Sequence, residues 1–169
     1  HMRDTLEACG GLCNERSVDI LVTECPDPVR ELIAWGAHFD TDPTGSIALT
    51  REGGHHRNRI AHAGGDATGA EVSRALVAAV RADPGIDVVE NALVLDIITS
   101  ASGRTAGVTL HVIGPGQRDG VGAALAPSVV LATGGFGQVF GQTTNPYVAT
   151  GDGAALALRA GAAVADLEF

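Results

Sequence analysis

Two stretches of the sequence place glycines beside residue types that could hold a ligand. In VVLATGG, an apolar run ends at Thr133, Gly134 and Gly135. Glycine leaves the main chain bare, so a ligand can approach it closely, and ligands of open α/β sheets bind beyond the carboxyl ends of strands. In TGDG, Asp152 opens an apolar segment of helical character. Its carboxylate could cap the free N–H groups of that helix or contact a cofactor hydroxyl, and both interpretations stay open.

A third stretch, TREGGHHRNRIAHAGGDATG, gathers charged residues and histidines around two glycine pairs. It could be an exposed polar loop. It could also be a substrate loop, in which the arginines attract a carboxylate and Glu52 attracts an amine. The three histidines lack the H-x-x-x-H spacing of a helical metal site, so we expect no metal here.

The first half of the chain predicts helices and one hairpin. We expect a Thr68–Glu71 capping box at the start of the longest helix, because the spacing T-x-x-E allows both side chains to bond exposed N–H groups. The other expected elements are helices at residues 3–8 and 17–23, a helix with an Asp27 cap and Pro28 in its first turn that ends at Gly36, and a hairpin over 38–50 with its turn at 43–45.

The second half has the pattern of strands. Residues 86–89, 92–100 and 105–113 are rich in β-branched residues and are separated by turns, which predicts successive strands. Residues 128–133 predict a strand buried on both faces, residues 151–161 a buried helix and residues 163–169 a last strand. The expected fold class is α/β: a partial Rossmann-like domain with an inserted β-meander. It has no G-x-G-x-x-G after an N-terminal strand, so the phosphate-binding βαβ unit is missing.

Composition excludes several classes of protein. The net charge of −9 disfavours a nucleic-acid partner, because binding phosphates needs a basic face. No apolar run approaches the ~20 residues of a membrane span. Three cysteines, Cys9, Cys13 and Cys25, in a chain without a secretory leader indicate reduced thiols in a cytoplasmic protein.

Four segments together resemble the L-aspartate oxidases, a family within the succinate dehydrogenase and fumarate reductase flavoprotein superfamily: TREGGHHRNRIAHAGGDATGAEV, VVLATGGFGQVF, TTNPYVATGDGAALALRAGA and VADLEF. ATGG and TGDG are shared across the superfamily, whereas the Glu of REGGH is more specific to aspartate oxidases. The resemblance implies an FAD-dependent enzyme of NAD biosynthesis. It implies that L-aspartate is oxidised to iminoaspartate and that the electrons pass to oxygen or fumarate.

The resemblance also assigns expected roles to residues. Glu52 would recognise the α-amino group of the substrate, and Asp152 would contact FAD. The full set of cofactor-binding residues that it implies is Thr133, Gly134, Gly135, Thr144, Asn145 and Asp152.

Other parts of the family pattern are not in the sequence. The QFHPT stretch, with its substrate-binding His, and the Arg proposed as catalytic acid/base would follow Phe169, so we expect no catalytic residue within the chain. We expect residues 1–2 to be a tag remnant and residues 3–169 to be one partial FAD-binding domain that ends where a capping domain would begin. Such a piece is expected to be inactive, to bind FAD weakly or not at all, and to self-associate through an open sheet edge.

Two alternatives remain. The chain could come from a fumarate reductase or succinate dehydrogenase flavoprotein, against which Glu52 argues. It could also be a non-catalytic module that reuses the FAD-binding fold.

Overall fold

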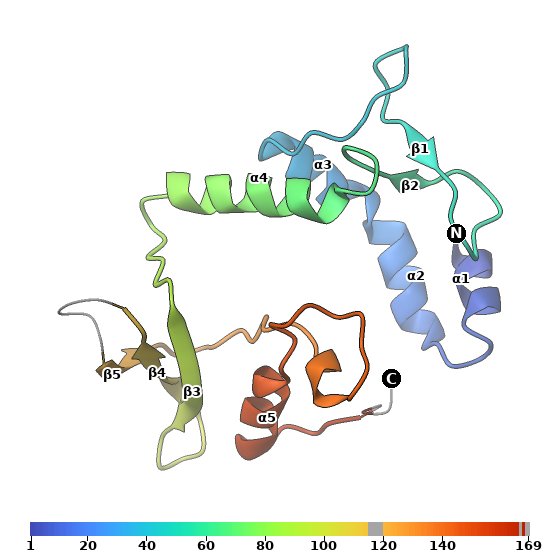
Figure 1. The fold of residues 1–169 in the computed structure, drawn as a ribbon. Coiled ribbons are helices and arrows are strands. Elements are labelled where there is room, and N and C mark those ends of the chain that lie inside the picture. The colour runs from blue at the N-terminus through green and yellow to red at the C-terminus, as the bar shows by residue number, and fades with distance from the viewer. Residues whose placement is uncertain (115–119, 166, 168–169) are drawn as a thin grey trace. The chain divides into compact units, whose positions relative to one another are not determined.

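The computed structural model describes residues 1–114, 120–165 and 167. Its contacts divide the chain into two compact units, His1–Val88 and Val89–Phe169, and each is described by itself (Figure 1). The first unit contains four helices and a short two-stranded sheet, and the second contains a three-stranded sheet and a short helix. In the described part of the chain, no helix has both the length and the apolar character needed to cross a bilayer.

The first unit, all of which is described, follows the predicted order of elements closely. Its buried apolar residues are small, namely Val18, Ala37, Ala63 and Ala75, as expected of a chain with 4% aromatic residues. The helices expected at 3–8 and 17–23 are confirmed. The elements are α1 (Met2–Ala8), α2 (Glu15–Glu24), α3 (Pro26–Ala34), β1 (Leu49–Thr50), β2 (Ile60–Ala61) and α4 (Thr68–Ala82).

Helix α3 begins earlier than the sequence suggested. Its N-cap is Cys25 and Pro26 is its first residue. Asp27, expected to be the cap, lies inside the first turn, where its carboxylate accepts a hydrogen bond from Arg30 at 2.5 Å. Pro tolerates the first helical positions because their N–H groups have no partner within the helix. The predicted end at Gly36 is confirmed.

The capping box predicted for α4 is wrong. Ala67 is the N-cap, no side chain caps the helix, and Thr68 is already its first residue. The Thr68 hydroxyl instead accepts a hydrogen bond from the Ala63 N–H at 3.2 Å. Glu71 accepts one from the His38 N–H at 2.6 Å and pairs with Arg74 through Nε at 2.8 Å. Both polar side chains therefore connect α4 to neighbouring segments, since tertiary partners compete with the local N–H groups.

The predicted hairpin turn at 43–45 is confirmed. One carboxylate oxygen of Asp42 accepts hydrogen bonds from the N–H groups of Thr44 at 2.8 Å and Ser46 at 3.1 Å, a local pattern that favours tight turns. The chain then enters β1, which pairs antiparallel with β2. The polar stretch 51–59 is the loop that joins these two strands.

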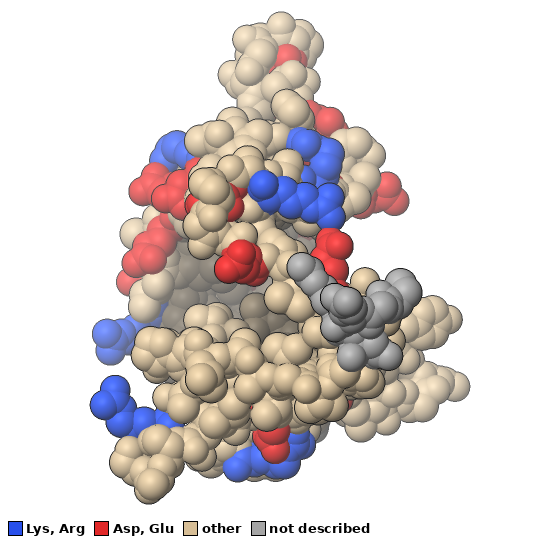
Figure 2. Space-filling view, turned by 90° about the vertical axis from the view of Figure 1, so that its left-hand side faces the viewer, with Lys and Arg blue, Asp and Glu red and all other residues tan. Residues whose placement is uncertain are grey.

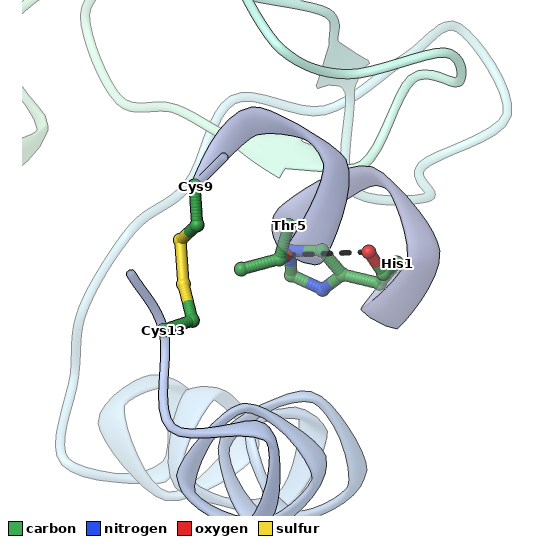
Figure 3. The surroundings of a disulfide bond; sticks show 4 residues. All are labelled: His1, Thr5, Cys9 and Cys13. Carbon is green, nitrogen blue, oxygen red and sulfur yellow. Dashed lines mark hydrogen bonds between the residues drawn. A yellow bond between two sulfur atoms is a disulfide. The ribbon is translucent and has the colours of Figure 1, made fainter. Parts of the chain in front are cut away.

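Cys9 and Cys13 form a disulfide, which contradicts the expectation of reduced thiols (Figure 3). The Cα atoms are 5.8 Å apart, a normal separation for the bond. Cys9 follows the last residue of α1, and the Gly10–Gly11 turn brings Cys13 back toward it. The count of three cysteines could not show this, because it says nothing of how the turn folds. Cys25 is free and exposed.

The disulfide predicts a thiol count. Chain purified without reductant and then unfolded in denaturant should react with one equivalent of a thiol reagent, through Cys25. The same sample should react with three equivalents after reduction. Three reactive thiols before reduction would show that Cys9 and Cys13 are unpaired in the protein.

The second unit is built on an antiparallel meander, as predicted. The strand order is β3-β4-β5. Residues 86–89, expected to be a strand, are not one, and the third strand is instead the GVGAAL segment. Its glycines and alanines have low strand propensity, which pairing with β4 overrides. The elements are β3 (Ala92–Thr99), β4 (Thr105–Val112), β5 (Gly120–Leu125), the 3₁₀ turn η1 (Gly137–Val139) and α5 (Asp152–Arg159).

A bulge in β3 connects the meander to α5. The ladder pairs Val94 with Leu110 and then Asp96 with Thr109, so Leu95 is an extra residue. The freed Leu95 carbonyl accepts a hydrogen bond from Arg159 Nη2 at 3.0 Å. The alternation of faces that is typical of a strand is therefore interrupted where α5 packs on the sheet.

Of two elements expected to be buried, one is exposed in the structure and the other is only partly buried. Residues 128–133 form no strand, and the Val130 side chain is 89% exposed. In α5, Leu156 is buried but Leu158 is 61% exposed. A strand buried on both faces needs a hydrogen-bonded neighbour and two covering layers, and the described residues provide none for this segment. Of the last predicted strand, residues 163–165 and 167 are not in a strand, and the other residues lie outside the described part.

Candidate functional site

The turn at Thr133–Gly135 and the start of α5 are packed together within the second unit. Gly153 is buried and lies so close to Thr133 that a Cβ added to it would overlap the Thr133 hydroxyl. A residue larger than glycine therefore does not fit at position 153 without movement of the turn. The two glycine-rich stretches that the sequence singled out thus belong to one site.

Two hydrogen bonds from Gln138, one from its backbone and one from its side chain, close the loop between these stretches. Gln138 donates from its N–H to the Ala149 carbonyl at 3.0 Å and from Nε2 to the Asn145 carbonyl at 2.7 Å. The Asn145 side chain packs against Gly137, and its Nδ2 donates to the Thr143 hydroxyl at 3.0 Å. Asn145 therefore lies beside η1, close to the turn. Asn145 and Thr144 are both exposed.

Asp152 does not cap α5. The N-cap is Gly151, and no side chain caps the helix. The exposed Asp152 carboxylate accepts a hydrogen bond from the Thr150 hydroxyl at 2.5 Å. The first N–H that bonds at this end is that of Ala155, to the Gly151 carbonyl at 3.0 Å. Of the two interpretations that the sequence left open, the capping one is not observed.

The main chain at Gly134 and Gly135 is bare. A Cβ built on either residue has no atom within 4 Å, so the face on which a side chain would lie is open space. Gly134 has φ +76°, which residues other than glycine rarely adopt. An open backbone turn, an exposed carboxylate and unbonded N–H groups at a helix start are the features that a dinucleotide contacts. The residues present therefore fit a nucleotide cofactor.

Glu52 lies in the first unit, in the loop between β1 and β2. Its side chain is exposed and makes no hydrogen bond or ion pair with any described residue. The Glu52 carbonyl accepts a hydrogen bond from the His55 N–H at 3.2 Å, which closes the Gly53–Gly54 turn. The loop borders a hollow of about 330 Å³ lined by Gly53, Gly54 and His55 together with residues of α1.

Asp4 of α1 holds this loop. It is 8% exposed, and its Oδ2 accepts hydrogen bonds from the His56 N–H at 2.9 Å and from Arg59 Nη1 at 2.7 Å. The hydrogen bond from the His56 backbone is the main cause that lowers the pKa of Asp4 to about 2, and Arg59 adds to it. Nothing in the sequence singles out Asp4, because one acidic residue in a short helix is usually exposed.

A second carboxylate holds the next glycine pair. Asp40 accepts hydrogen bonds from the N–H groups of Gly64 at 3.1 Å and Gly65 at 3.3 Å. These bonds lower the pKa of Asp40. The His62 ring lies 3.5 Å from the same carboxylate. Without Asp40, these two N–H groups could bind an anion. The Asp40 carboxylate takes that place, so both N–H groups have a partner within the protein. The described residues contain no cluster of three or more potential metal ligands.

The depressed pKa values predict acid sensitivity. Hydrogen bonds from Arg74 and then from the His38 N–H lower the pKa of Glu71 from 4.5 to about 2. A carboxylate with a lowered folded-state pKa stabilises the fold above its unfolded pKa and loses that contribution as the pH falls through the folded value. Urea unfolding should therefore show stability decreasing between about pH 4.5 and pH 2. Glu71→Gln should be less stable than wild type at pH 7, with the difference shrinking toward pH 2; a difference independent of pH would contradict the assignment.

Charged side chains of both signs are interspersed on the face shown in Figure 2. Acidic and basic residues lie side by side there, and no broad patch of a single sign is visible. The expectation that the chain has no nucleic-acid partner stays a prediction.

Comparison with known proteins defines the class. The whole chain, residues 1–169, matches the model of the FAD binding domain family, and the chain belongs to that family. FAD is the cofactor that this membership indicates. Among solved structures, the succinate dehydrogenase Sdh1 of Mycobacterium smegmatis aligns with a TM-score of 0.85 and 36% identity over 95% of this chain and 28% of its own. The E. coli quinol fumarate reductase FrdA aligns with a TM-score of 0.85 and 32% identity over 94% of this chain and 26% of its own.

The curated relatives of this chain indicate a particular enzyme within this class. An L-aspartate oxidase of Streptomyces coelicolor is 73% identical over 169 residues, which are 100% of this chain and 29% of that protein. The L-aspartate oxidase of Mycobacterium tuberculosis H37Rv is 48% identical over 100% of this chain and 30% of its own length. A chloroplastic L-aspartate oxidase of Arabidopsis thaliana is 44% identical over 100% of this chain and 26% of its own. The chain thus spans less than a third of the length of these relatives. The expected resemblance and the partial FAD-binding fold are confirmed.

The structure brings most of the predicted cofactor residues together. Thr133, Gly134, Gly135, Asn145 and Asp152 lie in one unit, around the start of α5. Thr144 is in the same loop but makes no side-chain hydrogen bond with the described residues. Glu52 is in the other unit, so its distance from the turn is not defined. Sequence reasoning missed Gly153, although the second glycine of TGDG was the available signal.

Proposed function

We propose that the chain is part of an FAD-dependent L-aspartate oxidase, in which the second unit holds FAD and the first unit carries Glu52 to recognise the substrate amine. The observation that carries this proposal is the identity of 73% with an L-aspartate oxidase over the whole chain. The product would be iminoaspartate, for use in NAD biosynthesis, and oxygen or fumarate would accept the electrons. The cytoplasmic location stays a prediction, and one relative is a chloroplast protein.

The second unit would hold the cofactor with its main chain. Gly134 and Gly135 would allow the nucleotide to lie against bare backbone, and the exposed Asp152 carboxylate would accept hydrogen bonds from cofactor hydroxyl groups. Asn145 would keep the loop beside η1 in place. When bound, FAD would accept the hydride from the α-carbon of the amino acid. The residues named here bind and orient, and none of them transfers a proton.

Glu52 would select an amino acid over a dicarboxylate without an amine. Its carboxylate has no partner among the described residues, so it is available to accept hydrogen bonds from an ammonium group. A charge-assisted hydrogen bond in a closed site discriminates strongly, because an analogue that lacks the amine leaves the buried carboxylate unpaired. Arg51 and Arg57 of the same loop would attract the substrate carboxylates.

A second candidate function is that of a fumarate reductase or succinate dehydrogenase flavoprotein. The TM-scores of 0.85 to such proteins favour it. Glu52 argues against it, because neither succinate nor fumarate has an amine. The 169-residue piece by itself would be inactive and would bind FAD weakly or not at all, since it has no glycine fingerprint for the diphosphate.

Assays of the full-length protein test the proposal. We expect it to oxidise L-aspartate with release of hydrogen peroxide in air, to reduce fumarate when oxygen is absent, and to leave succinate unreacted. Oxidation of succinate without oxidation of L-aspartate would favour the second candidate. A full-length protein that oxidises neither compound when supplied with FAD would indicate a non-catalytic module.

A further inference from the structure

The loop that carries Glu52 is held from outside by one buried carboxylate. Asp4 is 8% exposed and is the buried charged residue among the described ones. A single oxygen, Oδ2, accepts both the His56 N–H at 2.9 Å and Arg59 Nη1 at 2.7 Å. The Arg59 side chain is 18% exposed, so this ion pair is largely shielded from water.

Helix α1 touches the loop at further points. A Cβ added to Gly54 would lie 3.4 Å from the Ala8 Cβ, which is ordinary contact distance, so the Gly53–Gly54 turn rests on α1. The His56 ring lies 3.7 Å from the Glu7 carboxylate at the surface. Glu52 itself is joined to this part of the loop by the hydrogen bond from the His55 N–H to its carbonyl, at 3.2 Å.

The Asp4–Arg59 pair also controls charge within the loop. Arg59 lies seven positions after Glu52 and is the loop arginine that the structure neutralises through a short ion pair. Without Asp4, Arg59 would be an unpaired cation in the loop that carries Glu52. The pair therefore removes one competing cation from this loop, and it fixes the backbone four residues after Glu52.

We propose that Asp4 is a positioning residue for Glu52: it fixes the 52–59 loop and keeps Arg59 away, so that Glu52 can receive the ammonium group of an α-amino acid. This inference rests on the proposed role of Glu52 and adds a residue that makes no contact with the substrate. Asparagine at position 4 keeps the size of the side chain but removes the charge that pairs with Arg59.

Kinetics of the full-length protein give the first test. Asp4→Asn should raise the apparent KM for L-aspartate about tenfold, because a displaced binding group loses most of its contribution. Its KM for fumarate and its kcat should change by less than about twofold, because neither depends on the ammonium contact. The double variant Asp4→Asn/Glu52→Gln should have the KM of Glu52→Gln alone, since residues that act through one contact are not additive. Asp27→Asn, which removes an exposed ion pair with Arg30, is the matched control and should leave every value unchanged.

Limited proteolysis of the 169-residue chain gives a test that does not depend on activity. Trypsin cleaves after arginine, and the loop offers Arg51, Arg57 and Arg59. Asp4→Asn should be cleaved at these sites at least about tenfold faster than wild type, because proteolysis reports local opening. The Asp27→Asn control should be cleaved at the wild-type rate. If Asp4→Asn unfolds, Arg59→Lys keeps a cation that can reach Asp4, and it should show smaller changes in the same direction.

The outcomes separate this inference from the proposed function. If Glu52→Gln is selective for L-aspartate while Asp4→Asn changes neither the KM nor the cleavage rate, Asp4 is not a positioning residue and the inference is overturned. If Glu52→Gln is not selective, the role of Glu52 fails first. Faster cleavage with an unchanged KM for L-aspartate would show that Asp4 holds the loop for stability alone, and would also overturn the inference.

Discussion

Replacing Glu52 with Gln in the full-length protein raises the apparent KM for L-aspartate by about tenfold to a hundredfold, as expected from the loss of a charge-assisted hydrogen bond of about 1.5–3 kcal/mol. Glutamine keeps the shape of the side chain and removes its charge. The KM for fumarate should change by less than about twofold, because fumarate has no ammonium group to lose a partner. Steady-state assays with each substrate, under air and without oxygen respectively, measure both constants.

The matched control for this prediction is Glu31→Gln in α3. Glu31 is also exposed in the first unit, and its replacement removes the same charge without touching the loop. The control should leave both constants at their wild-type values. Equal increases of the two KM values in Glu52→Gln would remove Glu52 from amine recognition.

Replacing Gly135 with Ala should strip the full-length protein of FAD without weakening the fold. A Cβ at Gly135 has no atom within 4 Å, and φ there is outside the range that L residues avoid, so stability should be unchanged or higher by up to about 1 kcal/mol. The same methyl group would occupy the space in which the cofactor lies against the backbone. We expect the affinity for FAD to fall at least about tenfold, as overpacking of a tight contact costs about 1–3 kcal/mol.

Flavin absorbance per mole of purified protein and thermal unfolding of the flavin-free protein measure the two effects separately. Gly122→Ala is the control, because an added Cβ there also has no atom within 4 Å and β5 is outside the proposed site. Gly153→Ala would not separate the effects, because its Cβ would overlap Thr133. Full flavin content in Gly135→Ala would show that the cofactor does not lie against this turn.

Sequence patterns predicted the elements whose stability is local. The antiparallel meander was anticipated because β3 and β4 are rich in β-branched residues and are joined by a short turn. The turn at 43–45 and the end of α3 at Gly36 were predicted because proline and glycine have strong local backbone preferences. The strand expected at 128–133 was wrong, because an apolar segment becomes a strand only when it finds a neighbour to pair with.

Two predictions were wrong because the residues concerned have tertiary partners or depend on the path of a turn. The pattern T-x-x-E is a sound local signal, but Thr68 and Glu71 bond Ala63 and His38 instead, which no local rule indicates. The disulfide between Cys9 and Cys13 depends on the path of a two-glycine turn, and the count of cysteines carries no information about that path.

The candidate site was predicted in part. Glycine-rich stretches gave the turn at Thr133–Gly135 and the start of α5, because bare backbone has a direct sequence signature. The role of Asp4 was missed, since burial of one carboxylate depends on a partner 55 residues away in sequence, Arg59. Residues whose function is to hold another residue have no motif of their own.

The central claim is that FAD lies against the bare backbone beside Asp152, and amide hydrogen exchange of the full-length protein tests it most directly. Flavin-free protein would be compared with protein saturated with FAD. We predict slower exchange on FAD binding in the two segments 133–137 and 151–155, with little change at the β5 amides. Binding of FAD that leaves exchange in both segments unaltered would contradict the account.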